Sequence, residues 1–240
     1  MTRLVRSAHI GSIRIRTPFV APGQRIGVMG GSFNPPHEGH ARVAATALKR
    51  LGLDQLWWLV TPGNPLKEIG ALAPLAERMA ACRALAQGPR MFVTAFEAEL
   101  GTAYTAATLS FLRSRYPSAT FVWVMGADNL ASFHRWQDWR GIARAMPIAV
   151  VDRPGWRLKA LSSPAALALA RQRCREESAR LMALPLSPPR WTLLSTRLSE
   201  ESSTRLRNKE PVAGARPEVT NPAGRPNVTN PSATSRTTTS

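Results

Sequence analysis

The chain has 240 residues, of which 44% are hydrophobic, and a formal net charge of +17 at pH 7. This length suits one domain with appendages, and no apolar run reaches the roughly 18 to 20 residues that a transmembrane helix needs. We therefore expect a soluble protein without a membrane partner. The positive charge attracts polyanions of any kind, so charge alone does not choose between nucleic acids and nucleotides as partners.

Residues 1–24 carry four arginines and no acidic residue, and they lack the long apolar stretch of a secretory signal. We expect them to form a flexible N-terminal extension, while an Arg-rich transit peptide stays open as the alternative. The two cysteines, Cys82 and Cys174, lie in predicted helices and form no CxxC pair. This usage favours neither a disulfide framework nor a zinc knuckle, and it fits a cytoplasmic protein.

From residue 25 onward, short apolar runs alternate with longer helical patterns. Strands are predicted over 25–30, 56–60, 91–95, 120–126, 147–151 and 191–195, and helices over 37–51, 74–87, 105–115, 139–145 and 164–183, with a closing helix from about 203. Buried strands separated by helices form βαβ units with a parallel sheet. The sequence therefore predicts a doubly wound α/β domain over residues 25–209.

Residues 210–240 are rich in Pro, Thr, Asn, Ser and Gly and contain hardly any large apolar residue. Such a segment cannot bury enough surface to offset the entropy of ordering, so we expect a disordered tail. The predicted architecture is thus a single domain with flexible tails at both ends.

The polar motifs follow strands, as they should if the ligand binds beyond the carboxyl ends of a parallel sheet. The stretch "GGSFNPPHEGH" (residues 30–40) follows the first predicted strand, "TPGNPLK" the second, "GADNL" the fourth and "DRPG" the fifth. We therefore expect these four segments to meet at one edge of the sheet.

The first of these motifs allows three interpretations: a metal site, a pair of helix-capping histidines, or a phosphate site. His37 and His40 are three residues apart, whereas the helical zinc motif spaces its histidines by four and needs a third ligand. Neither the Gly-Lys-Ser/Thr of a P-loop nor the G-x-G-x-x-G of a dinucleotide fold is present. Gly30 and Gly31 permit a tight turn, and a helix starting near His37 would direct free N–H groups at an anion, which favours phosphate.

The stretch "GSFNPPHEGH" resembles the G-x-F-x-P-x-H-x-G-H signature of the nucleotidyltransferase superfamily. Within it, the chain is most similar to the bacterial nicotinate-nucleotide adenylyltransferases. Further matches are "NPLK" (64–67), "AYTAATL" (103–109), "GADNLASFHRW" (126–136) and "SSTRLR" (202–207), so that the resemblance spans residues 25–209. The N-terminal extension, the tail and the Ala- and Arg-rich stretch 157–190 depart from the family pattern.

The resemblance implies a Rossmann-like nucleotidyltransferase fold and the transfer of AMP from ATP to nicotinate mononucleotide. The products would be nicotinate adenine dinucleotide and pyrophosphate, formed by direct in-line attack without a covalent intermediate, in NAD biosynthesis. Mg²⁺ would be the cofactor, held mainly by the ATP phosphates rather than by protein ligands. The partners would be these small molecules, with no nucleic acid, and the chain would work as a monomer or a homodimer.

The resemblance also assigns residues to roles. The catalytic group would be His37, His40 and Arg207; the ATP-binding group Gly30, Gly31, Ser32, Phe33, Lys67, Gly126, Asp128, Ser203 and Thr204; the nicotinate mononucleotide-binding group Tyr104, Thr105, Trp136 and Arg153. Simpler interpretations stay open for several of them. Asp128 and Ser203 could cap helices, Trp136 could belong to the core, and Lys67 and Arg153 could be solvated surface charges.

Two rival functions remain. A sibling enzyme would adenylate nicotinamide mononucleotide or pantetheine phosphate, and the first motif does not separate these substrates. A basic nucleic-acid-binding module is the rival from another class, and it predicts steeply salt-dependent affinity that survives His40→Ala.

Overall fold

The computed structural model describes residues 6–10, 13–62, 72–102, 104–183 and 188–196. The chain divides into two units, Met1–Lys209 and Glu210–Ser240, and every described residue belongs to the first. The predicted tail and the predicted closing helix lie outside the described residues. Among the described helices, none combines the length and the apolar character that crossing a bilayer requires.

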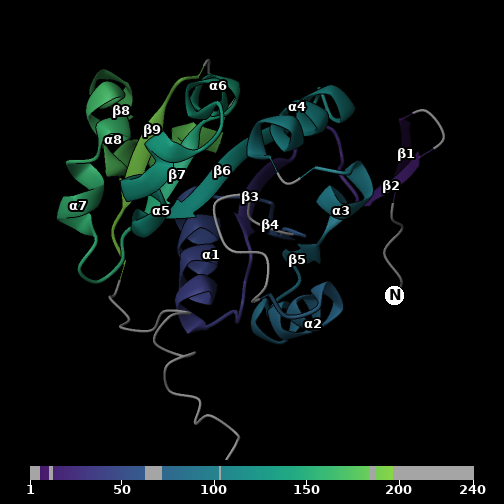
Figure 1. The fold of residues 1–240 in the computed structure, drawn as a ribbon. Helices are drawn as coiled ribbons and strands as arrows, with labels where there is room; N and C mark the ends of the chain where they lie inside the picture. Colours follow the sequence, from purple (N-terminus) through teal and green to yellow (C-terminus); the bar gives the residue numbers. More distant parts are fainter. Residues whose placement is uncertain (1–5, 11–12, 63–71, 103, 184–187, 197–240) are drawn as a thin grey trace, which may run out of the picture. The chain divides into compact units, whose positions relative to one another are not determined.

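The first unit is built on a seven-stranded sheet (Figure 1). Its strands are β3 (Arg25–Gly31), β4 (Gln55–Val60), β5 (Met91–Thr94), β6 (Thr120–Gly126), β7 (Ile148–Val151), β8 (Arg173–Cys174) and β9 (Trp191–Leu194). They lie in the order β5-β4-β3-β6-β7-β9-β8, and all neighbouring pairs are parallel. The predicted parallel α/β sheet is confirmed.

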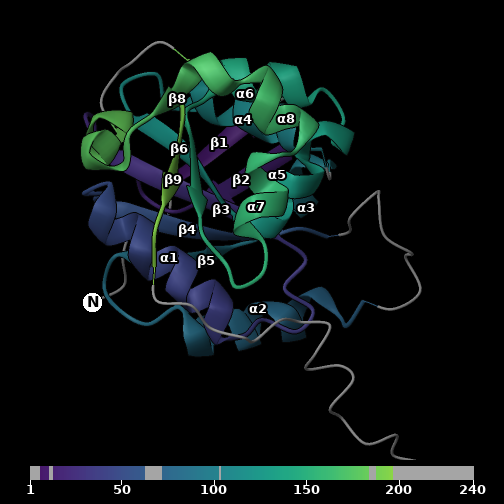
Figure 2. The ribbon, with the colours of Figure 1, turned by 90° about the vertical axis from the view of Figure 1, so that its left-hand side faces the viewer.

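Helices cover both faces of this sheet, as the perpendicular view in Figure 2 shows. The α-helices are α1 (Glu38–Arg50), α2 (Leu75–Leu85), α3 (Phe96–Leu100), α4 (Thr105–Arg115), α5 (Ala127–Ser132), α6 (Trp139–Ala145), α7 (Arg157–Leu161) and α8 (Pro164–Ala168). The described residues also form the 3-10 helices η2 (Phe133–Arg135), η3 (Ala170–Gln172) and η4 (Glu176–Ala183). Side chains of α1, α2 and η4 pack into one core cluster, and those of α4, α5, α6 and α8 into the other.

The strands separate these two clusters because successive side chains of a strand point to opposite faces. In β4, every residue is buried, Trp57 lies in one cluster and Trp58 in the other. This double burial is typical of a parallel sheet covered on both sides. It also explains why the strands could be recognised as continuous apolar runs.

The chain order reverses between β3 and β6, which lie side by side in the centre of the sheet. From β3 the chain proceeds through α1 to β4 and β5 on one side, and it then crosses to β6 and β7 on the other side. Ligands of such sheets bind outside the carboxyl ends of the strands at this reversal. The segments after Gly31 and Gly126 are therefore where the site should be.

Two strands precede the main sheet, in the segment for which the sequence predicted a flexible extension. β1 (Arg6–Ile10) and β2 (Ile13–Thr17) pair antiparallel. In β2, Ile15 and Thr17 are buried while Arg16 is exposed, and the Arg16 N–H donates to Glu99 of α3 over 2.6 Å. Ile15, Arg16 and Thr17 alternate between buried and exposed, with the period of two of a strand that has one face against a core. The predicted domain began at residue 25 and therefore did not include this strand.

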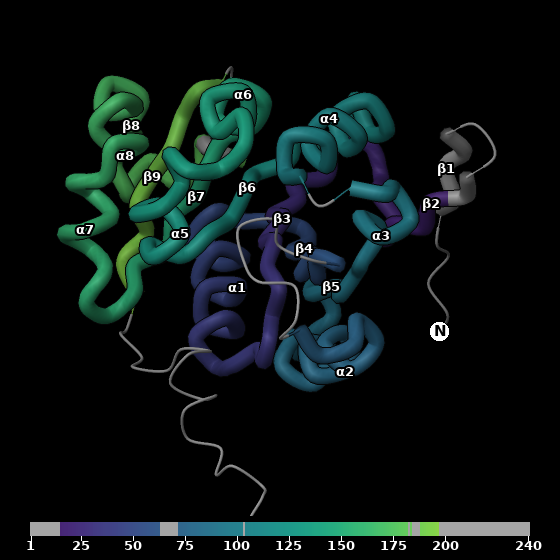
Figure 3. The backbone as a smooth tube through the Cα atoms, viewed as in Figure 1, coloured from purple at the N-terminus to yellow at the C-terminus, as the bar shows by residue number. Residues whose placement is uncertain are grey.

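The single long helix predicted over 164–183 is wrong. That segment contains α8, η3, the short strand β8 and η4, and Figure 3 traces α7 and α8 as separate short turns. Two side chains of β9 bind its backbone: Trp191 Nε1 donates to the Leu169 carbonyl over 2.8 Å, and the Thr192 hydroxyl to the Cys174 carbonyl over 3.2 Å. Pairing with β9 thus overrides the helix propensity of an Ala-rich sequence.

Candidate active site

The loop between β3 and α1 brings the two motif histidines to the start of a helix. His37 is the N-cap residue of α1, with an extended backbone. Its Nδ1 accepts a hydrogen bond from the Gly39 N–H over 3.0 Å, and the His40 Nδ1 accepts one from the His37 N–H over 3.2 Å. The two ring centroids are 3.9 Å apart. The capping interpretation is thus confirmed, and both rings lie at a helix N-terminus, where anions bind favourably.

These two hydrogen bonds determine the tautomer of each ring. A neutral imidazole carries its hydrogen on one nitrogen and accepts with the other. Because both Nδ1 atoms accept from backbone N–H groups, the hydrogen of each neutral ring is on Nε2. The hydrogen bonds of the helix cap thus orient both rings and leave the hydrogen of each neutral ring on Nε2, at the positive end of the helix dipole.

His37 stays neutral over a wide pH range. It is 4% exposed, and burial, followed by the positive charge of Arg153, lowers the pKa of its imidazole to about 4 despite the opposing effect of Asp128. At neutral pH this ring is a hydrogen-bond donor without a charge.

The two glycines at the end of β3 make room for aromatic rings. A Cβ on Gly30 would lie 2.5 Å from the indole of Trp123, and a Cβ on Gly31 would lie 3.1 Å from the ring of Phe33. Phe33 has a φ of 46°, a left-handed conformation that costs an L-residue roughly 1–2 kcal/mol. Its ring is buried against Trp58 and the edge of His40, and this packing offsets the strain.

The helix that follows the neighbouring strand β6 contributes an acidic residue near His37. Asp128 lies in the first turn of α5, and its Oδ2 forms a 3.0 Å ion pair with Arg153, which follows β7. A Cβ on Gly126 would lie 2.4 Å from Asp128 Oδ1, so the close approach of this carboxylate requires glycine. Asp128 Oδ1 is buried and accepts no hydrogen bond in the described part of the chain, which leaves an acceptor at the site.

Asp152 orders the loop after β7; the sequence analysis included it in the "DRPG" segment but gave it no role. Its carboxylate is 6% exposed, accepts the Arg153 N–H over 2.9 Å, and pairs with Arg157 over 3.1 Å. This pairing fixes the backbone of Arg153 next to Asp128. An aspartate directly after the apolar run of β7 was the available signal.

Trp136 lies beyond η2 and is held by other aromatic rings. It is half-buried, and it meets Trp123 edge to face at 6.3 Å and Phe133 at 5.4 Å between ring centroids. Trp123 in turn fills the space beside Gly30. A chain of contacts thus joins the strand before the histidine loop to Trp136.

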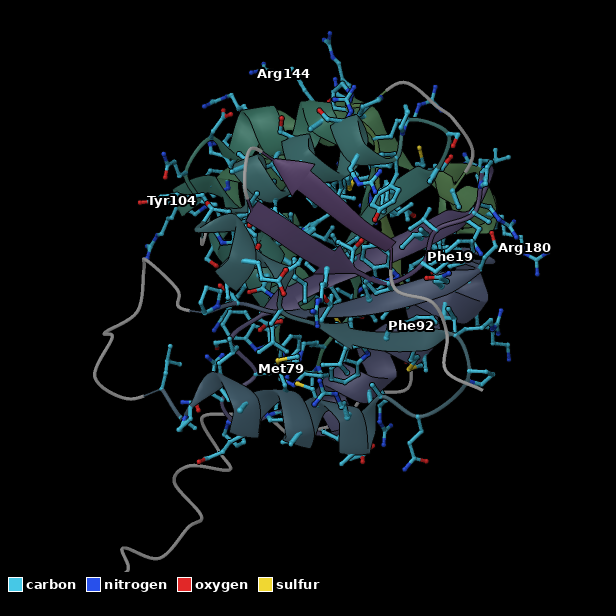
Figure 4. The ribbon with its side chains drawn as sticks, turned by 90° about the vertical axis from the view of Figure 1, so that its right-hand side faces the viewer. Phe19, Met79, Phe92, Tyr104, Arg144 and Arg180 are labelled. Atoms are coloured by element: carbon cyan, nitrogen blue, oxygen red, sulfur yellow. The ribbon has the colours of Figure 1, made fainter. Side chains whose placement is uncertain are left out.

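Tyr104 and Thr105 stand at the start of α4. Tyr104 is its N-cap residue and is 46% exposed, and Figure 4 shows its side chain at the edge of the molecule. Thr105 is half-buried in the first turn. Tyr104 makes no ring contact with Trp136 within the described residues, so the structure does not bring these two together.

Four predicted site residues lie outside the described residues: Lys67, Ser203, Thr204 and Arg207. Among the described ones, Asp128 and Arg153 form an ion pair and both act electrostatically on His37, whereas Tyr104 lies apart from Trp136. The sequence analysis also gave no role to Asn34, which lies in the first motif, and missed Arg78; both fasten the histidine loop to the beginning of α2.

A resident metal centre does not fit the donor set of the described residues. They contain no group of three or more His, Cys, Asp or Glu side chains that could hold a metal ion. Asp128 is paired with Arg153, and both motif histidines use Nδ1 for the helix cap.

Comparison with known proteins agrees with this geometry. Residues 28–209 match the cytidylyltransferase-like family. The chain is 58% identical over 183 residues to a probable nicotinate-nucleotide adenylyltransferase of Rhizobium meliloti, with 76% of this chain and 97% of the relative covered. A probable nicotinate-nucleotide adenylyltransferase of Agrobacterium fabrum is 55% identical over the same shares of the two chains.

A solved structure with the same fold is that of the Plasmodium falciparum nicotinic acid mononucleotide adenylyltransferase complexed with NaAD. It superposes with a TM-score of 0.58 at 16% identity, covering 77% of this chain and 83% of that one. The complex of that protein with APC gives a TM-score of 0.57. The chain therefore belongs to the cytidylyltransferase-like family, and within it to the nicotinate-nucleotide adenylyltransferases.

Proposed function

We propose that this protein transfers AMP from ATP to nicotinate mononucleotide, releasing pyrophosphate and nicotinate adenine dinucleotide in NAD biosynthesis. The observation that carries the proposal is the pair of capping histidines at the reversal point of the sheet, with both Nε2–H groups prepared as donors. The relatives named for this activity, at 58% and 55% identity, support the choice of reaction.

The reaction forms one bond and breaks another at the α-phosphorus of ATP. A phosphate oxygen of nicotinate mononucleotide attacks the α-phosphorus in line, and the bond to the departing pyrophosphate breaks. The protein must orient two anions and neutralise the charge that grows on the transferred and leaving groups. Orientation alone contributes about 7–11 kcal/mol in favourable systems.

His37 and His40 would donate Nε2–H hydrogen bonds to the ATP phosphates, with His40 on the α-phosphate. Because His37 is neutral at pH 7, its role is that of a dipolar donor rather than a cation. Backbone groups of the segment from Gly30 to Phe33 and of Gly126 would line the ATP site. The helix dipole of α1 would add a favourable field for the phosphates.

Asp128 would accept hydrogen bonds from the ribose of ATP, because its Oδ1 is an acceptor without a partner in the described residues. Arg153, its ion-pair partner, would contact the phosphate of nicotinate mononucleotide. Trp136 would stack on the nicotinate ring, and Tyr104 and Thr105 would complete that side through the start of α4.

Lys67, Ser203, Thr204 and Arg207 remain predictions as further phosphate contacts. Mg²⁺ would enter as part of the ATP substrate, held mainly by its phosphates, where it would neutralise charge on the leaving pyrophosphate.

We further propose that the protein works in the cytoplasm, as a monomer or a homodimer, on small molecules and not on nucleic acid. Cys82 and Cys174 are both free thiols, and burial raises the pKa of Cys82 to about 12. Unpaired thiols suit a reducing compartment.

The test is pyrophosphate release from ATP and Mg²⁺ with three acceptors in parallel: nicotinate mononucleotide, nicotinamide mononucleotide and pantetheine phosphate. We expect the highest kcat/KM with nicotinate mononucleotide. A preference for either of the other acceptors would refute the substrate assignment. DNA or RNA binding that is unchanged in His40→Ala, without pyrophosphate release in the wild type, would refute the enzyme assignment altogether.

A further inference from the structure

Arg78, in the first turn of α2, is a buried arginine whose hydrogen-bond partners among the described residues are all backbone carbonyls. It is 3% exposed. Its Nη1 donates to the carbonyls of Ser32 over 2.7 Å and Thr61 over 2.8 Å, and its Nε donates to Ala73 over 2.8 Å. A weaker contact of 3.4 Å reaches the carbonyl of Pro62. In Figure 4, its neighbour Met79 marks the position of this helix.

The positive charge of Arg78 has no carboxylate partner in the described part of the chain. The ion pairs found there join other residues. Desolvation by burial lowers the pKa of the guanidinium, although arginine remains charged in proteins. Among the described residues, carbonyl dipoles balance this buried cation, and one of these carbonyls belongs to Ser32, the neighbour of Gly31. Such a cation favours an anion nearby.

The bond from Arg78 to Ser32 also determines where the loop directs its N–H groups. In a trans peptide, the C=O of one residue and the N–H of the next point in opposite directions. With the Ser32 carbonyl turned to Arg78, the Phe33 N–H points away from α2. The Gly31 carbonyl accepts from the Thr61 N–H over 3.0 Å, so the Ser32 N–H likewise points away from Thr61. Consecutive N–H groups with a left-handed residue are the components of an anion-binding nest.

A second contact fastens the same loop to α2. Asn34 Oδ1 accepts from the Ala73 N–H over 3.1 Å, and Ala73 O accepts from Arg78 Nε. The histidine loop and the end of β4 thus share one anchor at the beginning of α2.

We propose that Arg78 is a positioning residue for ATP, which holds the carbonyls of Ser32 and Thr61 so that the loop backbone forms a phosphate nest beside His37 and His40. This proposal rests on the proposed function, because it takes the anion bound beside the histidine loop to be the triphosphate of ATP. It adds a charged residue outside the motif, on a different helix, to the determinants of triphosphate binding.

The test compares Arg78→Met and Arg78→Lys with Arg83→Met, which removes an exposed charge from the same helix. Thermal unfolding, the Kd for a non-hydrolysable ATP analogue, and kcat and KM for both substrates are measured. Arg78→Met should raise the ATP KM and the analogue Kd by about tenfold or more and lower kcat similarly, with the nicotinate mononucleotide KM changed less than about threefold. Arg78→Lys should resemble Arg78→Met, because lysine retains the charge but not the planar fork that reaches several carbonyls.

The Arg83→Met control should stay within about twofold of the wild type in every quantity. Folded Arg78 variants whose ATP KM and analogue Kd also stay within that range would overturn the proposal, as would equal increases for both substrates. If Arg78→Met does not fold, the ATP KM and the analogue Kd of Arg78→Lys and Asn34→Ala are compared with the wild type in its place, with the same limit of about twofold. The Kd for the ATP analogue is measured without nicotinate mononucleotide. It therefore tests the role of Arg78 even if the protein does not transfer AMP to nicotinate mononucleotide.

Discussion

The proposed phosphate side and the proposed nicotinate side of the site are built in different ways. On the phosphate side, His37 and His40 have their ring orientation and tautomer determined by backbone hydrogen bonds. On the proposed nicotinate side, the Trp136 indole packs edge to face against Trp123 and Phe133, and Tyr104 is 46% exposed. Rigid donors are most valuable where charge develops in the transition state, whereas a stacking surface can adapt to its ligand. The phosphate side should therefore control kcat and the nicotinate side KM.

The largest effect is expected for His40→Ala on the phosphate side. Removing one prepared donor to a developing oxyanion typically lowers kcat by about 10²–10³. Steady-state pyrophosphate release measures the loss, and circular dichroism with thermal unfolding checks that α1 still forms without the second hydrogen bond of the cap. Near-normal kcat in a folded variant would contradict the role of this histidine.

The neutral His37 predicts a pH dependence of stability. The pKa of its imidazole is about 4 in the folded protein, while an unfolded histidine titrates near 6.5. The unfolded state therefore takes up the proton first, and stability should fall as the pH drops from about 6.5 towards 4.

His37→Asn isolates this contribution, because asparagine also caps helices but does not titrate. Chemical unfolding at pH 7 and below pH 4 should show that the wild type loses up to roughly 3 kcal/mol more than this variant. Equal losses in both proteins would show that His37 is not the group responsible.

Gly30→Ala should disturb both sides at once, because Trp123 lies between Gly30 and Trp136. The added Cβ would be 2.5 Å from the indole, and such overpacking costs about 1–3 kcal/mol. We expect a lower Tm and a higher KM for both substrates. Gly31→Ala, at 3.1 Å from Phe33, is the milder comparison, and a larger effect there would contradict this view of the packing.

The smallest effect should follow Trp136→Ala on the nicotinate side. Stacking of a base on an aromatic side chain contributes about 1–3 kcal/mol, so the KM for nicotinate mononucleotide should rise by roughly tenfold or more while the ATP KM and kcat change little. Trp136→Phe should restore much of the affinity. A loss mainly in kcat would contradict the view that the nicotinate side controls KM and the phosphate side controls kcat.

The central architecture was readable from the sequence because β3, β4 and β6 are apolar runs buried on both faces and followed by polar motifs. The positions of Gly30, His37 and Asp128 at the reversal point followed from that order. The helix predicted over 164–183 failed because pairing with β9 is a long-range interaction that local propensity does not contain.

Arg78 could not be assigned from sequence because a charged residue on a helix is usually solvated. The available signal was its spacing of four from Cys82, since both are the buried residues of α2. The proposed roles of Lys67 and Arg207 remain predictions, because they lie outside the described residues.

The double use of His37 affects how variants of this protein should be screened. Its Nδ1 caps α1, and in the proposed function its Nε2 donates to a phosphate, so one side chain would serve folding and catalysis through different atoms. A selection for soluble, heat-resistant protein would accept any residue that caps α1 as well as histidine does. Such a selection would discard the Nε2–H donor without detecting its loss, and libraries at this position need an activity readout beside the stability readout.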